Sequence, residues 1–309
     1  MTSDRTTTTT TAADAQPGPP GHPAPALQLV AMNLLGVVEH PALGDSPYRV
    51  DRDGRCYVPV GDGGIVLGLE LGDPAFGLVA DHAAPGACLV HPDPASRHAL
   101  ASYACIGNPV RVRTGQAAGA CGVVLGQRGE EGRVIIGLAQ ADLTRLRPAD
   151  EVAVRAYGQG LRPPGLRPEV SVMNIDPGLL ALLPVDLGGA DAPVTAGVRL
   201  TAPSRLAGNG IGRPAVSWDL DLQLPEPGEN GAGDLLMGDL VAVDDIDARY
   251  NMGYRRGWVT VGVVGHGASP LPGHGPGITP ILTGPAGALR PVPDAAGHVG
   301  LTAAMVQLQ

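Results

Sequence analysis

Lysine is absent from this chain of 309 residues, so all 21 basic residues are arginine. Schiff-base catalysis, anchoring of pyridoxal phosphate and the phosphate-binding lysine of a Walker-type loop all need an amine on a side chain. The sequence therefore excludes these three classes of chemistry. The glycine loop at 209–212 also lacks the dinucleotide-binding fingerprint, so no organic cofactor is expected.

Aromatic residues are scarce as well, at 3% with a single phenylalanine. The core must therefore be built from Val, Leu, Ile and Ala. The 46 glycines and 31 prolines make up about a quarter of the chain and separate short apolar runs. Such punctuation is typical of many short strands joined by tight turns.

Cysteine pairs and long hydrophobic runs are missing too. None of the four cysteines belongs to a Cys-x-x-Cys motif, and no basic leader typical of a secretory signal is seen. This predicts buried thiols in a reducing cytoplasm. The longest apolar stretch, 27–38, has about a dozen residues, which is too short to span a bilayer. We expect a cytoplasmic protein with no membrane partner.

The net charge of −9 bears on binding partners. A protein that binds a polyanion needs a concentrated basic face to overcome such a field. The densest arginine stretches, 145–167 and 255–256, have acids nearby. Nucleic acid is therefore not the expected partner, and a small-molecule substrate is.

Apolar runs along the chain predict the fold class. Residues 1–26 form a low-complexity Thr/Ala/Pro/Gly stretch that is predicted to be disordered. Later runs are mostly short, bounded by Gly, Pro or Asp and rich in β-branched residues, which favours strands. We predict an all-β fold of two barrel- or sandwich-like domains with few short helices. The expected parts are an N-terminal β domain at 27–168, a C-terminal β domain at 169–293 and a tail or docking arm at 294–309.

One segment of the N-terminal domain predicts a small barrel at 106–158. Strand-like runs at 108–113, 122–126 and 133–137 alternate with glycine turns at 115–119 and 129–132. The run at 106–137 resembles the KOW-type SH3-like module of some ribosomal and transcription proteins. That resemblance implies a hairpin topology and leaves open an RNA- or protein-binding role.

Short motifs recur in a familiar order over most of residues 30–285. They resemble a family of bacterial and archaeal proteins known only as a domain of unknown function. The resemblance implies an ordered, mainly β fold and no established reaction. The family pattern has a histidine between the second-domain carboxylates where this chain has Ile246, which argues against a ligand role there. The motifs are Cys-Ile-Gly-Asn at 105–108, Ala-Tyr-Gly-Gln-Gly at 156–160, Met-Asn-Ile-Asp-Pro at 173–177, Gly-Ile-Gly at 210–212 and Gly-His-Gly-Pro-Gly at 273–277.

The first candidate for a functional residue is His274. Gly273 and Gly275 flank it, and glycine lets the backbone approach a ligand closely. The imidazole suits a general base, a metal ligand or an oxyanion donor. His266 closes a strand-like run eight residues earlier, so the loop can fold back and join the two rings. The alternative is a tight turn with an exposed histidine.

Two pairs of carboxylates form the second candidate. Asp245 and Asp247 share one face of an extended segment, and Asp219 and Asp221 have the same i, i+2 spacing. Two acids on one face can share a proton or hold a hard cation. We predict a catalytic role for Asp245 and Asp247 and a substrate-binding role for Asp219 and Asp221. The alternative for either pair is a solvated face of a sheet.

Further candidates lie elsewhere in the chain. Asp81 and His82 close an apolar run, where a catalytic dyad and a simple turn are both common. Cys105 precedes Ile-Gly-Asn at 106–108 and could be a nucleophile or a small core residue, and Asn108 is a nearby substrate-binding candidate. Arg255 could clamp a substrate carboxylate or belong to the surface.

The sequence favours a small-molecule enzyme that uses Asp and His side chains. Hydrolysis, cyclisation or elimination of a small amide- or lactone-like substrate fits acids and imidazoles without an amine. Alternatives are an RNA- or protein-binding module built on KOW-like barrels and a non-catalytic structural oligomer. The many sheet edges predict a homo-oligomer. A divalent metal ion stays an open alternative, with His82, His266, His274 and Asp245 as its candidate ligands and Asp219 as a substitute for Asp245.

Overall fold

The computed structural model describes residues 29–41, 43–129, 132–189, 192–225, 234–294 and 297–307. The stretch 1–26, predicted to be disordered, lies outside these described residues. Among them, no helix combines the length and the apolar character needed to cross a membrane.

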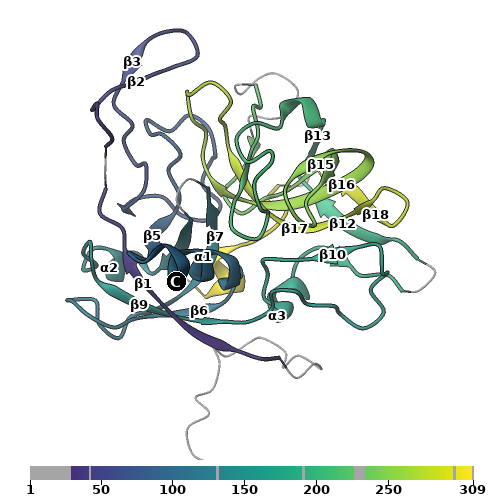
Figure 1. Cartoon of the computed structure of the whole chain (residues 1–309), viewed down its shortest axis with the longest axis horizontal. Coiled ribbons are helices and arrows are strands. Elements are labelled where there is room, and N and C mark those ends of the chain that lie inside the picture. Colours follow the sequence, from purple (N-terminus) through teal and green to yellow (C-terminus); the bar gives the residue numbers. More distant parts are fainter. Residues whose placement is uncertain are drawn as a thin grey trace, which may run out of the picture.

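Six antiparallel strands of the N-terminal half close into a barrel (Figure 1). The ring closes because β5 pairs with both β8 and the end of β1. Along β9, Val152, Val154 and Ala156 are buried while their neighbours are more exposed. Because side chains alternate along a strand, every second residue of β9 points toward the barrel interior. In order around the ring, the strands are β1 (Met32–Val38), β9 (Glu151–Ala156), β6 (Pro109–Val112), β7 (Cys121–Arg128), β8 (Arg133–Leu138) and β5 (Gly86–Val90).

Two short helices belong to this half. The helix α1 (Pro94–Tyr103) packs against β1 and β8 and adds Leu100 to the barrel core. Asp93 caps its N-terminus by accepting a hydrogen bond from the backbone N–H of Ser96 at 2.8 Å, and proline occupies its first turn. The second helix, α2 (Gln140–Leu143), is a single turn.

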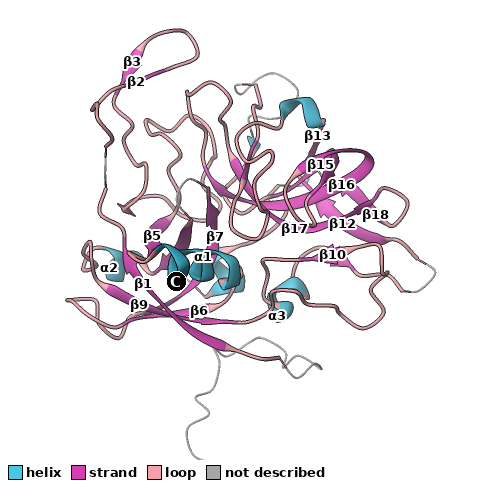
Figure 2. Cartoon of the chain, in the orientation of Figure 1, coloured by secondary structure: helices cyan, strands magenta, loops and turns pink. Residues whose placement is uncertain are grey.

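A long excursion joins β1 to β5 and is mostly loop (Figure 2). It contains the paired strands β2 (Arg49–Val50) and β3 (Cys56–Tyr57), and β4 (Ile65–Val66), which pairs with β5. Its last part crosses to the C-terminal half. There His82 N–H donates to the carbonyl of Ala268 at 3.2 Å, and Gly267 N–H donates to that of Ala83 at 2.9 Å. These bonds fix the backbone around His82 beside the end of β16.

The C-terminal half is built on a second sheet with the order β10-β17-β16-β15-β13, in which β14 also pairs with β17. A smaller sheet has the order β11-β12-β18. The strands are β10 (Ser171–Val172), β11 (Val185–Asp186), β12 (Val194–Val198), β13 (Leu200–Ala202), β14 (Leu220–Asp221), β15 (Leu240–Asp247), β16 (Gly253–His266), β17 (Gly277–Pro285) and β18 (Leu289–Pro293). The helical turns are α3 (Pro177–Leu180), η1 (Ser204–Leu206) and α4 (Ala303–Val306).

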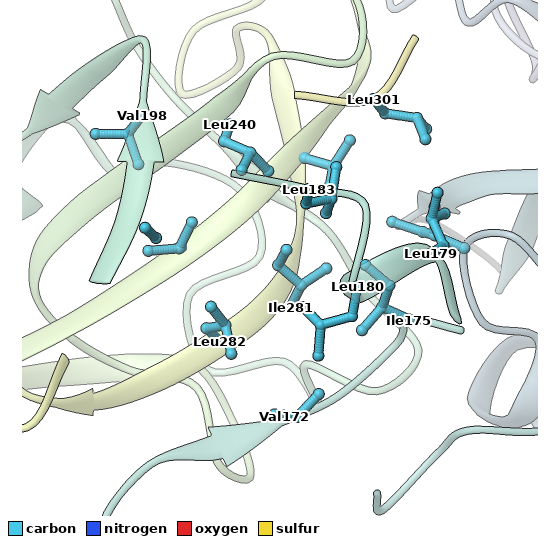
Figure 3. Packing of buried hydrophobic residues seen from close by; sticks show 14 of the residues in the cluster. Val172, Ile175, Leu179, Leu180, Leu183, Val198, Leu240, Ile281, Leu282 and Leu301 are labelled. Carbon is cyan, nitrogen blue, oxygen red and sulfur yellow. The ribbon is translucent and has the colours of Figure 1, made fainter. Parts of the chain in front are cut away.

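One apolar cluster joins the two halves. It combines Leu125 and Ile135 of the barrel with Val261 of the second sheet. Figure 3 shows a part of this cluster, where Leu180 of the short helix α3 lies beside Ile281 of β17. The end of β7 meets the start of β17, because the N–H of Gln127 donates to Thr279 Oγ1 at 2.9 Å.

The predicted fold class is confirmed, since the described chain is mainly β, with few short helices and one closed barrel. Four of the barrel strands fall within the predicted small barrel at 106–158, and β1 and β5 complete the ring. The domain boundaries stay a prediction. In the segment proposed as a tail or docking arm, Leu301 is fully buried in the shared cluster.

Candidate active site

Three histidines and two aspartates from four separate segments meet between the two halves. The strand register brings most of them together, because Gly277 in β17 pairs with Asp221 on one side and with His266 on the other. The excursion of the N-terminal half adds the remaining histidine. We call the five residues the His/Asp cluster, and they are His82, Asp219, Asp221, His266 and His274.

Asp221 lies at the centre of the His/Asp cluster. Its Oδ2 is 2.8 Å from Nδ1 of His274 and 3.7 Å from Nε2 of His82. Its Oδ1 is 3.2 Å from Nε2 of His266, and Asp219 Oδ2 is 2.7 Å from that same nitrogen. The nitrogens His82 Nε2 and His274 Nδ1 are 2.9 Å apart. Five side chains thus direct nitrogen and oxygen atoms at one another.

The backbone of Gly277 leaves the space that this convergence needs. A Cβ atom at this position would lie 2.0 Å from His266 Nε2 and 2.4 Å from Asp219 Oδ2. Neither contact is tolerable for non-bonded atoms. Glycine is therefore required at 277 for the ring and the carboxylate to approach each other.

A hydrogen-bond partner of His266 and an ion-pair partner of His82, on the far side of the two rings, decide which nitrogen faces the cluster with a lone pair. His266 Nδ1 is 2.9 Å from the carbonyl oxygen of Gly267, which can only accept, so Nδ1 carries a hydrogen. His82 Nδ1 lies 2.8 Å from Asp81 Oδ1, and the carboxylate favours a hydrogen there as well. In the neutral tautomer, both Nε2 atoms then face carboxylate oxygens with a lone pair. Such contacts are repulsive unless the rings are protonated or a cation lies between the atoms.

The pKa shifts of His266, His82 and Asp221 also indicate that positive charge is stabilised in the cluster. Burial alone would lower the pKa of His266, but hydrogen bonds with Asp219 and Asp221 outweigh burial and raise it to about 10. The pKa of His82 is likewise raised, because hydrogen bonds with Asp221 and Asp81 outweigh burial. Burial would raise the pKa of Asp221, but its three histidine partners hold it well below the usual value.

Charged groups behind His82 hold it in place. Asp81 also accepts hydrogen bonds from Tyr57 Oη at 2.9 Å and from an Arg49 nitrogen at 3.1 Å. Burial would raise the pKa of Asp81, but its hydrogen bonds, first from His82, hold it below the usual value. His82 itself has φ of 51°, a left-handed conformation that costs energy for any residue but glycine. The surrounding bonds therefore impose an unfavourable backbone to place this ring.

The cavity inside the His/Asp cluster is small. It is also lined by Arg128, Gly129 and Asn209, and its free space is about 10 Å³. That is room for a single ion or water molecule within the cluster, so a larger ligand would have to reach it from the solvent side. Of the three rings, His274 is the most exposed, at 16% of its side chain, so this ring marks the side that faces solvent.

Two overlapping sets of donors fit a divalent cation, and Asp221 belongs to both: His82, Asp221 and His274, and Asp219, Asp221 and His266. Metal–ligand bonds of about 2.0–2.2 Å hold neighbouring ligand atoms roughly 3–3.5 Å apart. The contacts within the cluster run from 2.7 Å to 3.7 Å. Two carboxylates balance a charge of +2 when the three imidazoles are neutral, and this mixture of nitrogen and oxygen ligands suits zinc, manganese or iron.

The structure does not bring the other predicted carboxylate pair to this place. Asp245 accepts a hydrogen bond from Gly257 N–H at 2.6 Å, and Asp247 is paired with Arg249 and Arg255. Asp247 pairs with Gly253 in β16, some thirteen residues before His266, a separation on the order of 40 Å along an extended strand. Arg255 also lies over the Trp258 ring at 4.3 Å, so it does not reach the cluster.

Cys105 and Asn108 have structural partners instead. Cys105 is fully buried, and burial raises the pKa of its thiol to about 12, which keeps it protonated. Asn108 Oδ1 accepts from the backbone N–H groups of Cys105 and Tyr157, at 2.9 Å and 3.1 Å. Together they tie the start of β6 to the end of β9.

The flanking glycines act through the backbone. Gly273 has φ of 80°, and its carbonyl accepts from Asn209 N–H at 2.8 Å. A Cβ at Gly275 would lie 1.9 Å from the carbonyl oxygen of Leu222. Both glycines therefore let the loop that carries His274 pack against the segment that carries Asp221.

Several site residues were missed by sequence reasoning. Arg128 ends β7 and forms a buried ion pair with Asp62, which Arg49 also contacts at 2.6 Å. The N–H of Gly129 donates to Asp219 Oδ1 at 2.5 Å, which leaves Oδ2 facing His266. The glycine after a strand-like run was visible in the sequence, but nothing there distinguished Arg128 from the other arginines.

Together these features define a mainly β protein with a histidine–aspartate centre between its two halves. The chain belongs to the family described as "Domain of unknown function (DUF4438)", whose N-terminal model matches residues 48–181 and whose C-terminal model matches 185–301. The predicted family resemblance is thereby confirmed. His82 falls in the first model, and the other four members of the cluster fall in the second.

A solved structure is also similar to this chain. It is described as "Crystal structure of TM1086", with 34% sequence identity and a TM-score of 0.82. The similarity covers 87% of this chain and 95% of the other. No match was found among curated proteins.

Proposed function

We propose that the chain is a metal-dependent enzyme for a small molecule, of the hydrolase or lyase/cyclase class. The His/Asp cluster would hold one divalent cation between His82, His266, His274 and the two carboxylates of Asp219 and Asp221. One observation carries this proposal: the carbonyl of Gly267 fixes the hydrogen of His266 on Nδ1, so that Nε2 faces two carboxylates. A cation between these atoms turns a repulsive contact into ligand bonds.

The residues around the cation have separate tasks. Asp81 holds the His82 ring by its Nδ1 atom, and Gly129 N–H fixes one oxygen of Asp219. A bound divalent cation polarises a carbonyl group and lowers the pKa of a water molecule. His274 is the ring nearest to solvent and next to Asp221, so it would complete the ligand set at the mouth of the cavity.

The substrate class rests on the chemistry of the side chains. Imidazoles and carboxylates beside a Lewis acid suit the opening or closing of an amide or lactone bond, or an elimination, and need no amine. A small amide- or lactone-like substrate therefore remains the proposed class. A cytoplasmic location and a homo-oligomeric state also stay predictions from the sequence.

An acid–base enzyme without a metal is the second candidate. The raised pKa of His266, about 10, favours it, because an imidazolium also satisfies the two carboxylates. In that case His266 would serve as a buried charge, and His82 and His274 would exchange a proton through their 2.9 Å contact.

Metal analysis separates the two candidates. The protein is purified without chelators, dialysed, and its metal content is measured by plasma mass spectrometry. We expect close to one zinc, manganese or iron per chain, and at most a tenth of that in His266→Ala. His98→Ala is the matched control, because His98 is exposed on α1 and should retain the full amount. If no stoichiometric ion is found, and none binds on addition, the metal-dependent candidate is wrong and the acid–base candidate remains.

A further inference from the structure

The guanidinium group of Arg128 has a donor that the folded chain does not use. Arg128 is 5% exposed, and one of its terminal nitrogens pairs with Asp62. Its other terminal nitrogen, Nη1, is buried and has no hydrogen-bond partner among the described residues. A guanidinium group stays charged at any relevant pH, so deprotonation does not remove this unsatisfied donor.

Arg128 belongs to the wall of the cation cavity. It lines the same space as His82, Asp221, His266 and His274. The next residue, Gly129, donates its N–H to Asp219, so the main chain at Arg128 is fixed relative to a cation ligand. The residue that carries the unused donor therefore lines the cavity in which the cation would be bound.

The ion pair with Asp62 does not account for the position of Arg128. Asp62 also forms an ion pair with Arg49, in which Oδ2 lies 2.6 Å from Nη2 of the arginine. Two guanidinium groups therefore share the negative charge of Asp62. A buried donor without an acceptor costs free energy, and a charged one costs more than a neutral one. An acceptor supplied by a ligand would remove this cost, and a negatively charged oxygen would do so best.

We propose that the molecule bound at the centre carries a carboxylate, one oxygen of which lies on the cation and the other on Nη1 of Arg128. This inference rests on the proposed function, because it places the carboxylate against the cation. Arg128 offers only one free terminal nitrogen, so it makes a single charge-assisted bond and leaves the second oxygen to the metal. The substrate class is thereby narrowed to small acids whose reacting bond lies next to a carboxylate.

Cobalt-loaded protein tests the inference. The protein is titrated with acetate and, separately, with its neutral isostere acetamide. Binding of each is measured from the change in the visible absorption of the bound Co²⁺. We expect the wild-type protein to bind acetate at least tenfold more tightly than acetamide. In Arg128→Gln, acetate affinity should fall at least tenfold and acetamide affinity should change less than twofold.

Two further variants keep the result interpretable. Arg133→Gln removes a half-buried arginine of the next strand, β8, which pairs with Glu39 at 2.6 Å and does not line the cavity. This variant should bind acetate as the wild type does. Arg128→Lys keeps a positive charge for Asp62, but a single ammonium cannot serve both partners, so acetate should bind at least fivefold more weakly. If Arg128→Gln fails to fold, the lysine variant decides.

The outcomes distinguish the two proposals. Acetate affinity within twofold of wild type in both Arg128 variants overturns the carboxylate site while cobalt binding still supports the metal centre. A wild-type protein that does not prefer acetate to acetamide also overturns it. A wild-type protein that takes up no cobalt overturns the metal centre, and the carboxylate site with it.

Discussion

Replacing Gly277 with alanine adds one methyl group at the point where His266 and Asp219 meet. The new Cβ would lie 2.0 Å from His266 Nε2, whereas ordinary contact begins at 3.4 Å, so the ring must move by about 1.4 Å. Gly277 does not have a positive φ, so the backbone accepts alanine and the effect comes from this clash alone. Overpacking of this kind costs about 1–3 kcal/mol of stability.

The larger effect of Gly277→Ala should be on the site. A ligand displaced by more than 1 Å no longer shares a cation with the others, and we expect metal affinity to fall by about 100-fold or more. Competition with a metal-binding dye measures the affinity, and urea unfolding measures the stability. Gly287→Ala is the control, because a Cβ there would meet nothing within 4 Å. Metal affinity in Gly277→Ala within threefold of wild type would refute the geometry described for the cluster.

Three other predictions follow from the same structure. The pKa of His266 in the folded protein is raised from 6.5 to about 10, so the protonated ring stabilises the metal-free fold. This contribution should be complete below pH 6.5 and be lost as the pH rises toward 10. Excess zinc should reverse the trend, because the cation needs the neutral ring, and urea unfolding at a series of pH values measures both effects. Cys105→Ala should change metal content and activity by less than twofold, because the buried thiol lies apart from the cluster, and a tenfold loss in a stably folded variant would contradict this assignment. Asp247→Asn should leave one cation per chain and destabilise the fold by about 1 kcal/mol or less, because its arginine partners are partly exposed, whereas Asp219→Asn should lose the metal.

The sequence predicted the fold class because its signal is local. Short runs with β-branched residues and a period of two, as in β9, specify strands without any knowledge of their partners. Which strands close the barrel depends on pairings such as Val37 with Val90, and these contacts lie far apart in the chain. No local pattern encodes them.

The candidate site could be predicted only in pieces. His82, His266 and His274 were identified one by one, but the pairs Asp219/Asp221 and Asp245/Asp247 have the same spacing, and the sequence assigned the catalytic role to the second pair. The register of β14 and β16 against Gly277 decides between them, and it selects the first pair. At Asp245 the strand bulges and φ is 58°, and its carboxylate accepts from the backbone N–H of Gly257 in the neighbouring strand β16 instead.

The buried arginine was beyond sequence reasoning for a different reason. Arg128 is one of 21 arginines in a chain without lysine, so its residue type carries little information. Its importance arises from burial, from the shared Asp62 and from its position next to Gly129. These are properties of tertiary structure.

Crystallography at the absorption edge of a bound metal tests the central claim most directly. Zinc- or manganese-loaded crystals should give one anomalous peak about 2.0–2.3 Å from Nε2 of His82 and His266 and from Nδ1 of His274, with Asp221 also within bonding distance. The claim is contradicted if fully loaded crystals show no peak there and His266 Nε2 still contacts Asp219 directly at 2.7 Å.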